Sequence, residues 1–278
     1  MKYSLCVEKF YMDLPLEDKF AASKRDGFEY CEFWTWKHRD WGKMKKAIGD
    51  SGVKIAAFSG DDEFSLINPD ENSFYIDFLR KSIEKAMEVH CSHLVIHSDA
   101  LNPDGSAKEI GKPLSYEAKL LNMYRVLKEI APFAEKENIT LVLEPLNTCA
   151  DEPRAHPNYF LQYPEPAFEL TRQVGSDKVK VLYDIYHMQL MAGNVIRTLE
   201  KNIDQLGYIH LADVPGSHEP GTGELNHGNI LKALDSMGYE GFVGFELLPS
   251  ETDEKAIEAI KRICIYSERL NKVVIIKK

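Results

Sequence analysis

Eight short, β-rich runs recur along this chain, and each is followed by a segment long enough to form a helix. The runs are residues 3–7, 30–34, 53–58, 93–97, 140–144, 179–184, 208–211 and 242–246. Parallel strands need long crossover connections, which are usually helices. Eight such units within 278 residues favour an α/β chain folded as a closed (β/α)8 TIM barrel over an open, doubly wound sheet. No linker divides the chain, so we expect a single barrel domain over residues 1–278.

Amphipathic stretches of helical period lie between the runs, at residues 75–89, 116–137 and 254–270. The longest non-helical connections are residues 59–72, 98–114, 145–163 and 212–228. All four follow the C-terminal ends of expected strands, and this is the end of a barrel that carries the active site. Polar residues at the strand ends should therefore converge on one pocket.

Four of the apolar runs end in a residue that can bind a metal: Glu144, Asp184, His210 and Glu246. A carboxylate beside so much apolar sequence is costly unless it is paired or bound to a metal. Any one of the acids alone could be a satisfied structural group, but three converging carboxylates repel each other without a cation between them. The mixed oxygen and nitrogen donors predict one divalent ion, Mn, Mg, Co or Zn.

Other polar and aromatic residues fall near the same strand ends. His187 follows Asp184 by three residues, and it could donate a hydrogen bond to substrate oxygen or only pack near the helix start. His97 ends the fourth run, where it could line the pocket, contact substrate or support another residue. Glu32 ends an analogous run, and with Trp36 it could form a sugar-binding wall, although barrel packing explains the aromatic residues equally well.

Composition excludes several classes of protein. The net charge of −10 disfavours nucleic-acid binding, which depends on phosphate neutralisation by Lys and Arg. The five cysteines are widely spaced without a CxxC motif, which predicts reduced thiols and a cytoplasmic protein. The N-terminal residues lack the apolar core of a signal peptide, and no apolar run is long enough for a membrane span.

Three motifs identify a resemblance. IHLADVPGSHEPGTGE (209–224), YDIYHMQLMAGN (183–194) and LVLEPLN (141–147) resemble the hydroxypyruvate isomerase family of the xylose-isomerase-like TIM barrels, within the sugar phosphate isomerase/epimerase superfamily. The resemblance covers essentially the whole chain in strand order. It implies a metal-dependent isomerase that interconverts α-hydroxy aldehyde and ketone forms of a small sugar or sugar acid through a cis-enediolate.

The resemblance also implies roles for individual residues. Glu144, Asp184, His210 and Glu246 match the metal ligands of the family, and the two glutamates match its proton-transfer pair. His187 matches the histidine that contacts substrate oxygen. The EPGTGE segment would be a loop whose backbone approaches the site closely, because its glycines leave room for such an approach.

The sequence departs from the family pattern in three places. His210 is typical of the epimerases, where hydroxypyruvate isomerases have Gln. Ser217 stands where the family has an Arg that helps to hold a polar or anionic end of the substrate. The connection at 148–163 is longer than usual and brings Arg154 and His156, which could replace that contact or be exposed. An additional acid of the epimerases is not clearly reproduced, because position 150 is Ala150.

These departures leave other functions open. One is a ketose 3-epimerase or a keto-acid-sugar isomerase acting on a longer substrate, and another is a non-catalytic sugar-binding barrel. An enzyme resembling endonuclease IV is disfavoured, because Phe58-Ser59-Gly60 offers no additional histidine ligand. We expect a small carbohydrate or keto-acid substrate and no nucleic-acid or membrane partner. The sequence is compatible with a homo-oligomer.

Overall fold

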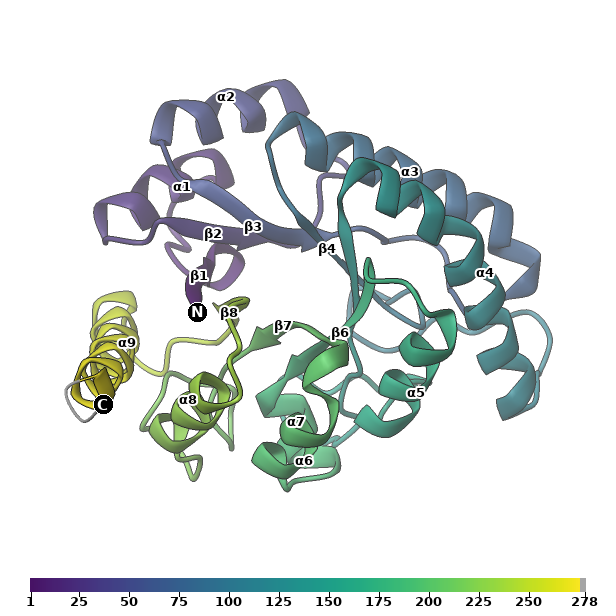
Figure 1. The fold of residues 1–278 in the computed structure, drawn as a ribbon. Coiled ribbons are helices and arrows are strands. Elements are labelled where there is room, and N and C mark those ends of the chain that lie inside the picture. The colour runs from purple at the N-terminus through teal and green to yellow at the C-terminus, as the bar shows by residue number, and fades with distance from the viewer. Residues whose placement is uncertain (276–278) are drawn as a thin grey trace.

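A closed barrel of eight parallel strands forms the centre of the molecule (Figure 1). The computed structural model describes residues 1–275, with side chains to residue 264. The strands are β1 (Lys2–Cys6), β2 (Tyr30–Phe33), β3 (Lys54–Ser59), β4 (His93–Ile96), β5 (Thr140–Leu143), β6 (Val179–Asp184), β7 (Leu206–His210) and β8 (Phe242–Phe245). Each strand pairs with the next along the chain, and β8 pairs with β1. The predicted TIM barrel is therefore confirmed.

Helices surround the barrel on its outer face (Figure 1). They are α1 (Leu16–Arg25), α2 (Trp41–Ser51), α3 (Asn72–Glu88), α4 (Tyr116–Glu137), α5 (Pro164–Val174), α6 (Ile185–Met191), α7 (Val195–Asn202), α8 (His227–Ser236) and α9 (Asp253–Ile275). Local signals explain their ends: the side chains of Asp40 and Ser115 cap the N-termini of α2 and α4, and Gly52 and Asn138 end these helices in the left-handed conformation. The helix predicted at 116–137 coincides with α4.

The inward faces of the strands carry the apolar core of the barrel interior. Its residues are Ala57, Val95, Val142, Leu182, Tyr208 and Phe242, and Ala56, which precedes Ala57 in β3, is buried in the same cluster. Successive residues of a strand point to opposite faces, so a side chain two positions further along points inward again, nearer the C-terminal end. Glu144, Asp184 and His210 stand two positions after core residues of β5, β6 and β7. The alternation of the strands therefore places these polar groups above a dry core.

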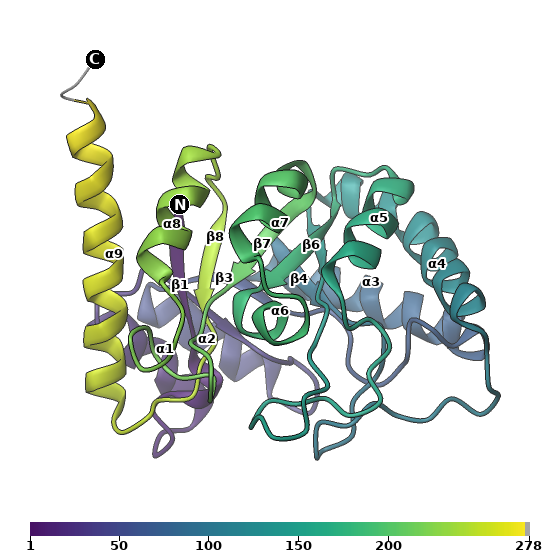
Figure 2. The same ribbon diagram turned by 90° about the horizontal axis from the view of Figure 1, so that it is seen from below.

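Long connections gather at the C-terminal ends of the strands. Figure 2 shows the blue-green and teal connections after β4 and β5 hanging from this end of the barrel.

The structure also bears on the cysteines and on membrane spans. Cys6, Cys31 and Cys91 are buried as free thiols. Through residue 275, no helix is both long and apolar enough to cross a membrane.

Candidate active site

Four buried side chains meet where β5, β6, β7 and β8 end. We call Glu144, Asp184, His210 and Glu246 the strand-end cluster; one potential ligand atom from each lies within 4.8 Å of all the others. His210 Nδ1 is 3.2 Å from Glu246 Oε2 and 3.3 Å from Glu144 Oε1. The four residues predicted to bind metal are therefore close enough in space to share one ion.

The electrostatics of the strand-end cluster fit a bound cation. Asp184 uses Oδ1 to cap α6 at the His187 backbone N–H, whereas its buried Oδ2 has no hydrogen-bond partner. Burial and the neighbouring Glu144 raise the pKa of Asp184 to about 7, against the opposing effect of Arg154. Burial also opposes protonation of His210, but Glu32 and Glu246 raise its pKa well above the ordinary range. Three oxygen donors and one imidazole suit a divalent metal ion.

Glu32 holds the far side of the His210 ring. Its Oε2 lies 2.8 Å from His210 Nε2, and its Oε1 accepts a 2.6 Å hydrogen bond from Ser4 Oγ. A carboxylate that accepts the proton of one ring nitrogen leaves the other nitrogen as a donor to a metal. Here the other nitrogen is Nδ1, which faces the three carboxylates of the cluster. Within the protein, the hydrogen bonds of Glu32 go to His210 and Ser4, and its expected contact with substrate stays a prediction.

Glu246 is fixed by donors on two sides. The indole N–H of Trp34 donates to Glu246 Oε1 at 2.6 Å, and Arg154 donates to Oε2. Burial disfavours the ionised form, but Arg154 and His210 outweigh it and hold the pKa of Glu246 well below its ordinary range. The carboxylate is therefore anionic and held in one orientation.

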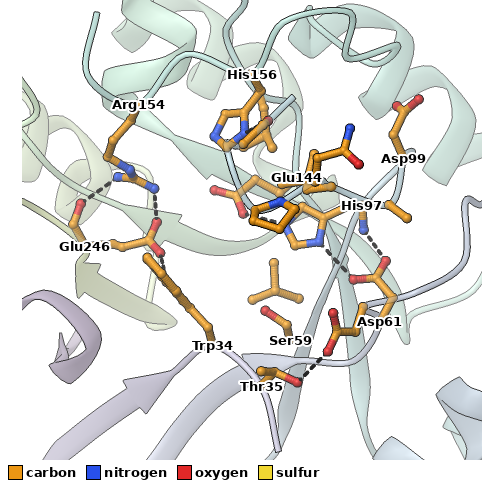
Figure 3. Close-up of a pocket in the computed structure, with 18 of the residues that line it drawn as sticks. Trp34, Thr35, Ser59, Asp61, His97, Asp99, Glu144, Arg154, His156 and Glu246 are labelled. Atoms are coloured by element: carbon orange, nitrogen blue, oxygen red, sulfur yellow. Dashed lines mark hydrogen bonds and ion pairs between the residues drawn. The ribbon is translucent and has the colours of Figure 1, made fainter. Parts of the chain in front are cut away.

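Glu144 is held in a similar way by His97, which lies on the side of the pocket opposite Glu246 (Figure 3). His97 Nε2 lies 3.4 Å from Glu144 Oε2, and His97 Nδ1 lies 2.9 Å from Asp61 Oδ1. Burial works against charge on both partners. Nevertheless, Asp61 and Glu144 raise the pKa of His97 to about 10, and His210 and His97 lower the pKa of Glu144 to about 2. Asp61 is itself fixed by the Tyr75 hydroxyl, which donates to Oδ2 at 2.9 Å.

His187 is fully buried and keeps one ring nitrogen without a partner. Its Nδ1 accepts hydrogen bonds from the backbone N–H and the side-chain amide of Asn147, at 3.2 and 2.6 Å. These contacts assign the proton to Nε2, which has no hydrogen-bond partner and lies 3.7 Å from Asp184 Oδ2. Burial and Arg154 hold the pKa of His187 well below its ordinary range, so the ring is neutral. A buried N–H donor therefore remains available beside the cluster.

Comparison with known proteins agrees with this geometry. The family model described as "Xylose isomerase-like TIM barrel" matches residues 20–265. The chain belongs to this family. A 2-oxo-tetronate isomerase from Haemophilus influenzae is 29% identical over 257 residues, which cover 89% of this chain and 93% of that protein. The hydroxypyruvate isomerase of Escherichia coli is 36% identical over 131 residues, covering 47% of this chain and 49% of that protein.

Solved structures show the same fold. A Brucella melitensis protein described as a family 2 AP endonuclease superposes with a TM-score of 0.80 at 24% sequence identity. The superposition covers 92% of this chain and 96% of the Brucella chain. Other solved structures of this fold are described as sugar 3-epimerases. At these identities the solved structures establish the fold alone, whereas the sequence relatives named as isomerases agree with the isomerase class predicted from the sequence.

A cavity of about 770 Å³ opens at the strand-end cluster. Among the predicted substrate-binding residues, His97, Arg154 and Glu32 line it. Trp36 does not line it, because its ring stacks on Phe78 of α3 and its N–H donates to Ser82. Trp34 takes that place in the pocket. His187 does not line the cavity either, because it is fully buried beside Asp184.

Two residues at the site were not chosen as site residues from the sequence, although Trp34 belongs to the aromatic group around Glu32. Trp34 stands two positions after Glu32, so the alternation of β2 could have identified it. Asp61 lies in the connection after β3, and no periodic pattern marks its position.

The EPGTGE segment is wrapped around Asp213 and does not line the cavity. The backbone N–H groups of Gly221 and Gly223 donate to Asp213 Oδ2 at 2.9 and 3.0 Å. A Cβ at Gly223 would lie 2.1 Å from the carbonyl oxygen of Val214, so this position requires glycine. The expected close approach of this segment is therefore to Asp213, a buried residue outside the strand-end cluster.

Proposed function

We propose that this protein is a metal-dependent isomerase of the hydroxypyruvate isomerase type, which interconverts α-hydroxy aldehyde and ketone forms of a small sugar acid. One observation carries the proposal: two ionised glutamates, Glu144 and Glu246, converge with Asp184 and His210 at the base of an open cavity. The names of the relatives support the same reaction class.

Glu144, Asp184, His210 and Glu246 would hold one divalent ion, with Mn, Mg, Co and Zn as the candidates. When bound, the ion supplies Lewis-acid polarisation of a carbonyl group and thereby acidifies the neighbouring C–H bond. The unpartnered Oδ2 of Asp184 and the Nδ1 atom of His210 support this donor set. Glu32 would keep His210 in the tautomer that the role needs.

Glu144 and Glu246 would transfer the proton. One carboxylate removes the proton from the carbon beside the carbonyl, and the electron pair of the broken C–H bond moves into the cis-enediolate of the substrate. A proton then returns to the neighbouring carbon, which exchanges the positions of carbonyl and hydroxyl. Trp34 and His97 would orient the two carboxylates from opposite sides of the pocket.

His187 would stabilise the negative charge that develops on substrate oxygen. Its neutral ring presents an unpartnered, buried N–H, and such a donor needs no rearrangement when the charge appears. Removal of one donor of this kind commonly lowers turnover by about 10²–10³-fold. We expect His187→Ala to fall in this range without loss of bound metal.

Solvent-deuterium incorporation tests the proposed chemistry. The metal-loaded protein is incubated in D₂O with hydroxypyruvate, four-carbon keto acids, pentuloses and hexuloses, and exchange is followed by NMR. We expect metal-dependent exchange at the carbon beside the carbonyl. Glu246→Gln should abolish it, whereas Glu63→Gln, which removes a pocket carboxylate paired with Lys37, should retain it. Full activity in a metal-loaded Glu246→Gln protein would refute the assignment.

A ketose 3-epimerase is the second candidate. His210 favours it through the resemblance to the epimerases, and a cavity of about 770 Å³ has room for substrates longer than three carbons. The same incubation separates the candidates: an isomerase moves the carbonyl along the chain, whereas an epimerase inverts one carbon and leaves the carbonyl in place. A non-catalytic sugar-binding barrel would give no exchange with any compound.

A further inference from the structure

The connection between β5 and α5 is anchored beside the strand-end cluster. Glu152 Oε2 accepts hydrogen bonds from the Gly216 backbone N–H at 2.9 Å and from the Tyr186 hydroxyl at 3.0 Å. The side-chain amide of Asn147 donates to the carbonyl oxygen of Arg154 at 3.0 Å. These contacts tie the connection to α6 and to the segment after β7, so the backbone of Arg154 is held in place.

The Arg154 guanidinium points from this connection into the pocket, toward Glu246 (Figure 3). Its Nη1 donates to the Glu246 carbonyl oxygen at 2.9 Å and to Ser217 Oγ at 3.3 Å, and Nη2 donates to the Glu246 carboxylate. Only 13% of the side chain is exposed. These bonds use three of the five N–H groups of a guanidinium, so two N–H groups have no hydrogen bond among the described contacts.

Arg154 differs from the other cations of the pocket. Lys9 lies over the Trp34 ring, Lys37 pairs with Glu63, and Lys108 has no ion pair with the cluster among the described contacts. Arg154 lies within 4.0 Å of both Glu246 and Asp184. Within the described residues, it is therefore the only Arg or Lys that reaches the cluster.

The charges of the site give Arg154 a specific consequence. The three carboxylates of the cluster would keep a net charge of about −1 after binding a divalent ion, and such a site repels an acidic ligand. Arg154 offsets one unit of this negative charge, and a guanidinium supplies paired N–H donors that match the geometry of a carboxylate. A neutral sugar gains nothing from either effect.

We propose that Arg154 binds the carboxylate of the substrate and makes the pocket selective for α-keto and α-hydroxy acids over neutral sugars. This inference rests on the proposed function for the identity of the acid as a substrate. Figure 3 shows Arg154 and Glu246 on one side of the pocket and His97 and Asp61 on the other. The acidic end of the substrate therefore faces Arg154, and the rest of its carbon chain extends toward Asp61.

Binding of matched acid and neutral ligands tests the inference without turnover. Erythronate and erythritol have the same four-carbon chain, but only erythronate carries a carboxylate. Calorimetry on the Mn-loaded, full-length protein should show erythronate binding about 10–100-fold more tightly, as expected for hydrogen bonds to a charged group. Arg154→Gln should reduce this preference toward one, and Arg154→Lys should keep an intermediate value. Lys108→Gln is the control, because it removes a pocket cation that has no ion pair with the cluster.

The metal content of every variant is measured in parallel. An Arg154→Gln protein with normal Mn content and an unchanged preference for erythronate would overturn the inference. A loss of preference in Lys108→Gln as large as in Arg154→Gln would also overturn it, because general pocket charge would then explain the selectivity. If Arg154→Gln fails to fold, Arg154→Lys provides the test. A preference for erythronate equal to that of the wild type in Arg154→Lys would rule out recognition of the carboxylate by two N–H donors of the guanidinium. If Arg154→Gln loses the preference for erythronate but the wild-type protein shows no solvent-deuterium exchange, the proposed function is refuted and the role of Arg154 in binding an anion is retained.

Discussion

Gly244→Ala is the sharpest test of how the candidate metal site is held. Gly244 lies in β8 beside His210 of β7, and Glu32 crosses the barrel interior over it. A Cβ at position 244 would lie 2.0 Å from Glu32 Oε1 and 3.0 Å from His210 Cδ2. Real Cβ contacts are essentially never shorter than 3.0 Å, so the Glu32 carboxylate must retreat by about 1 Å.

That displacement removes the partner of His210. The Glu32 Oε2–His210 Nε2 distance is 2.8 Å, and lengthening it by about 1 Å ends the hydrogen bond. Loss of such an outer partner commonly lowers metal affinity by about 10–100-fold. The overpacked interior should also cost about 1–3 kcal/mol in the free energy of unfolding. Chelator competition measures the first effect, and urea unfolding of the metal-free protein measures the second.

Gly49→Ala is the matched control. Gly49 lies within α2, and a Cβ there meets nothing within 4 Å. The exchange should leave metal affinity unchanged and stabilise the protein by up to about 1 kcal/mol, because alanine is the better helix former. Wild-type metal affinity in Gly244→Ala would show that Glu32 does not hold His210 for the metal.

Three further predictions concern stability. Burial lowers the pKa of His93 to about 4, so the unfolded chain binds this proton at a higher pH than the folded protein does. As the pH falls from about 6.5 to 4, the free energy of unfolding should therefore fall by about 2 kcal/mol. Urea unfolding of His93→Gln as a function of pH should lack this fall. Asp213 accepts the backbone N–H groups of Val214, Gly221, Gly223 and Leu225, so Asp213→Ala should lower the free energy of unfolding by about 3 kcal/mol; an unchanged urea midpoint would contradict this. Metal at 100 times its dissociation constant should stabilise the protein by about 2.7 kcal/mol, and thermal denaturation of Asp184→Asn should show a much smaller metal effect.

The fold could be predicted because a buried parallel strand has a simple sequence signature. Each strand of the barrel interior is a short apolar run, and the helices between the strands keep a 3.6-residue period. The strand at 179–184 and the helix at 116–137 were predicted with the observed bounds. Glu144, Asp184 and His210 stand out for the same reason, since each interrupts an inward-facing apolar series.

The partners that hold these groups could not be predicted in the same way. Asp61 reaches His97 from the connection after β3, and Arg154 reaches Glu246 from the connection after β5. The positions of both depend on loop conformation, which has no periodic signature. Trp34 and Trp36 both continue the alternation of Tyr30 and Glu32, and the sequence does not show that only Trp34 lines the pocket.

The contact between Glu32 and His210 is an example of a site feature that depends on residues from several strands. Its contact with His210 joins strands that are not neighbours in the barrel, β2 and β7, so no local pattern in either strand can reveal it. The contact exists because Gly244, in the strand next to β7, has no side chain and leaves space for a carboxylate to cross the barrel interior. A glycine within an apolar strand often marks such a close approach. In a barrel of this kind, glycines within the strands therefore help to predict the site, because the space they leave determines which acid can reach which histidine.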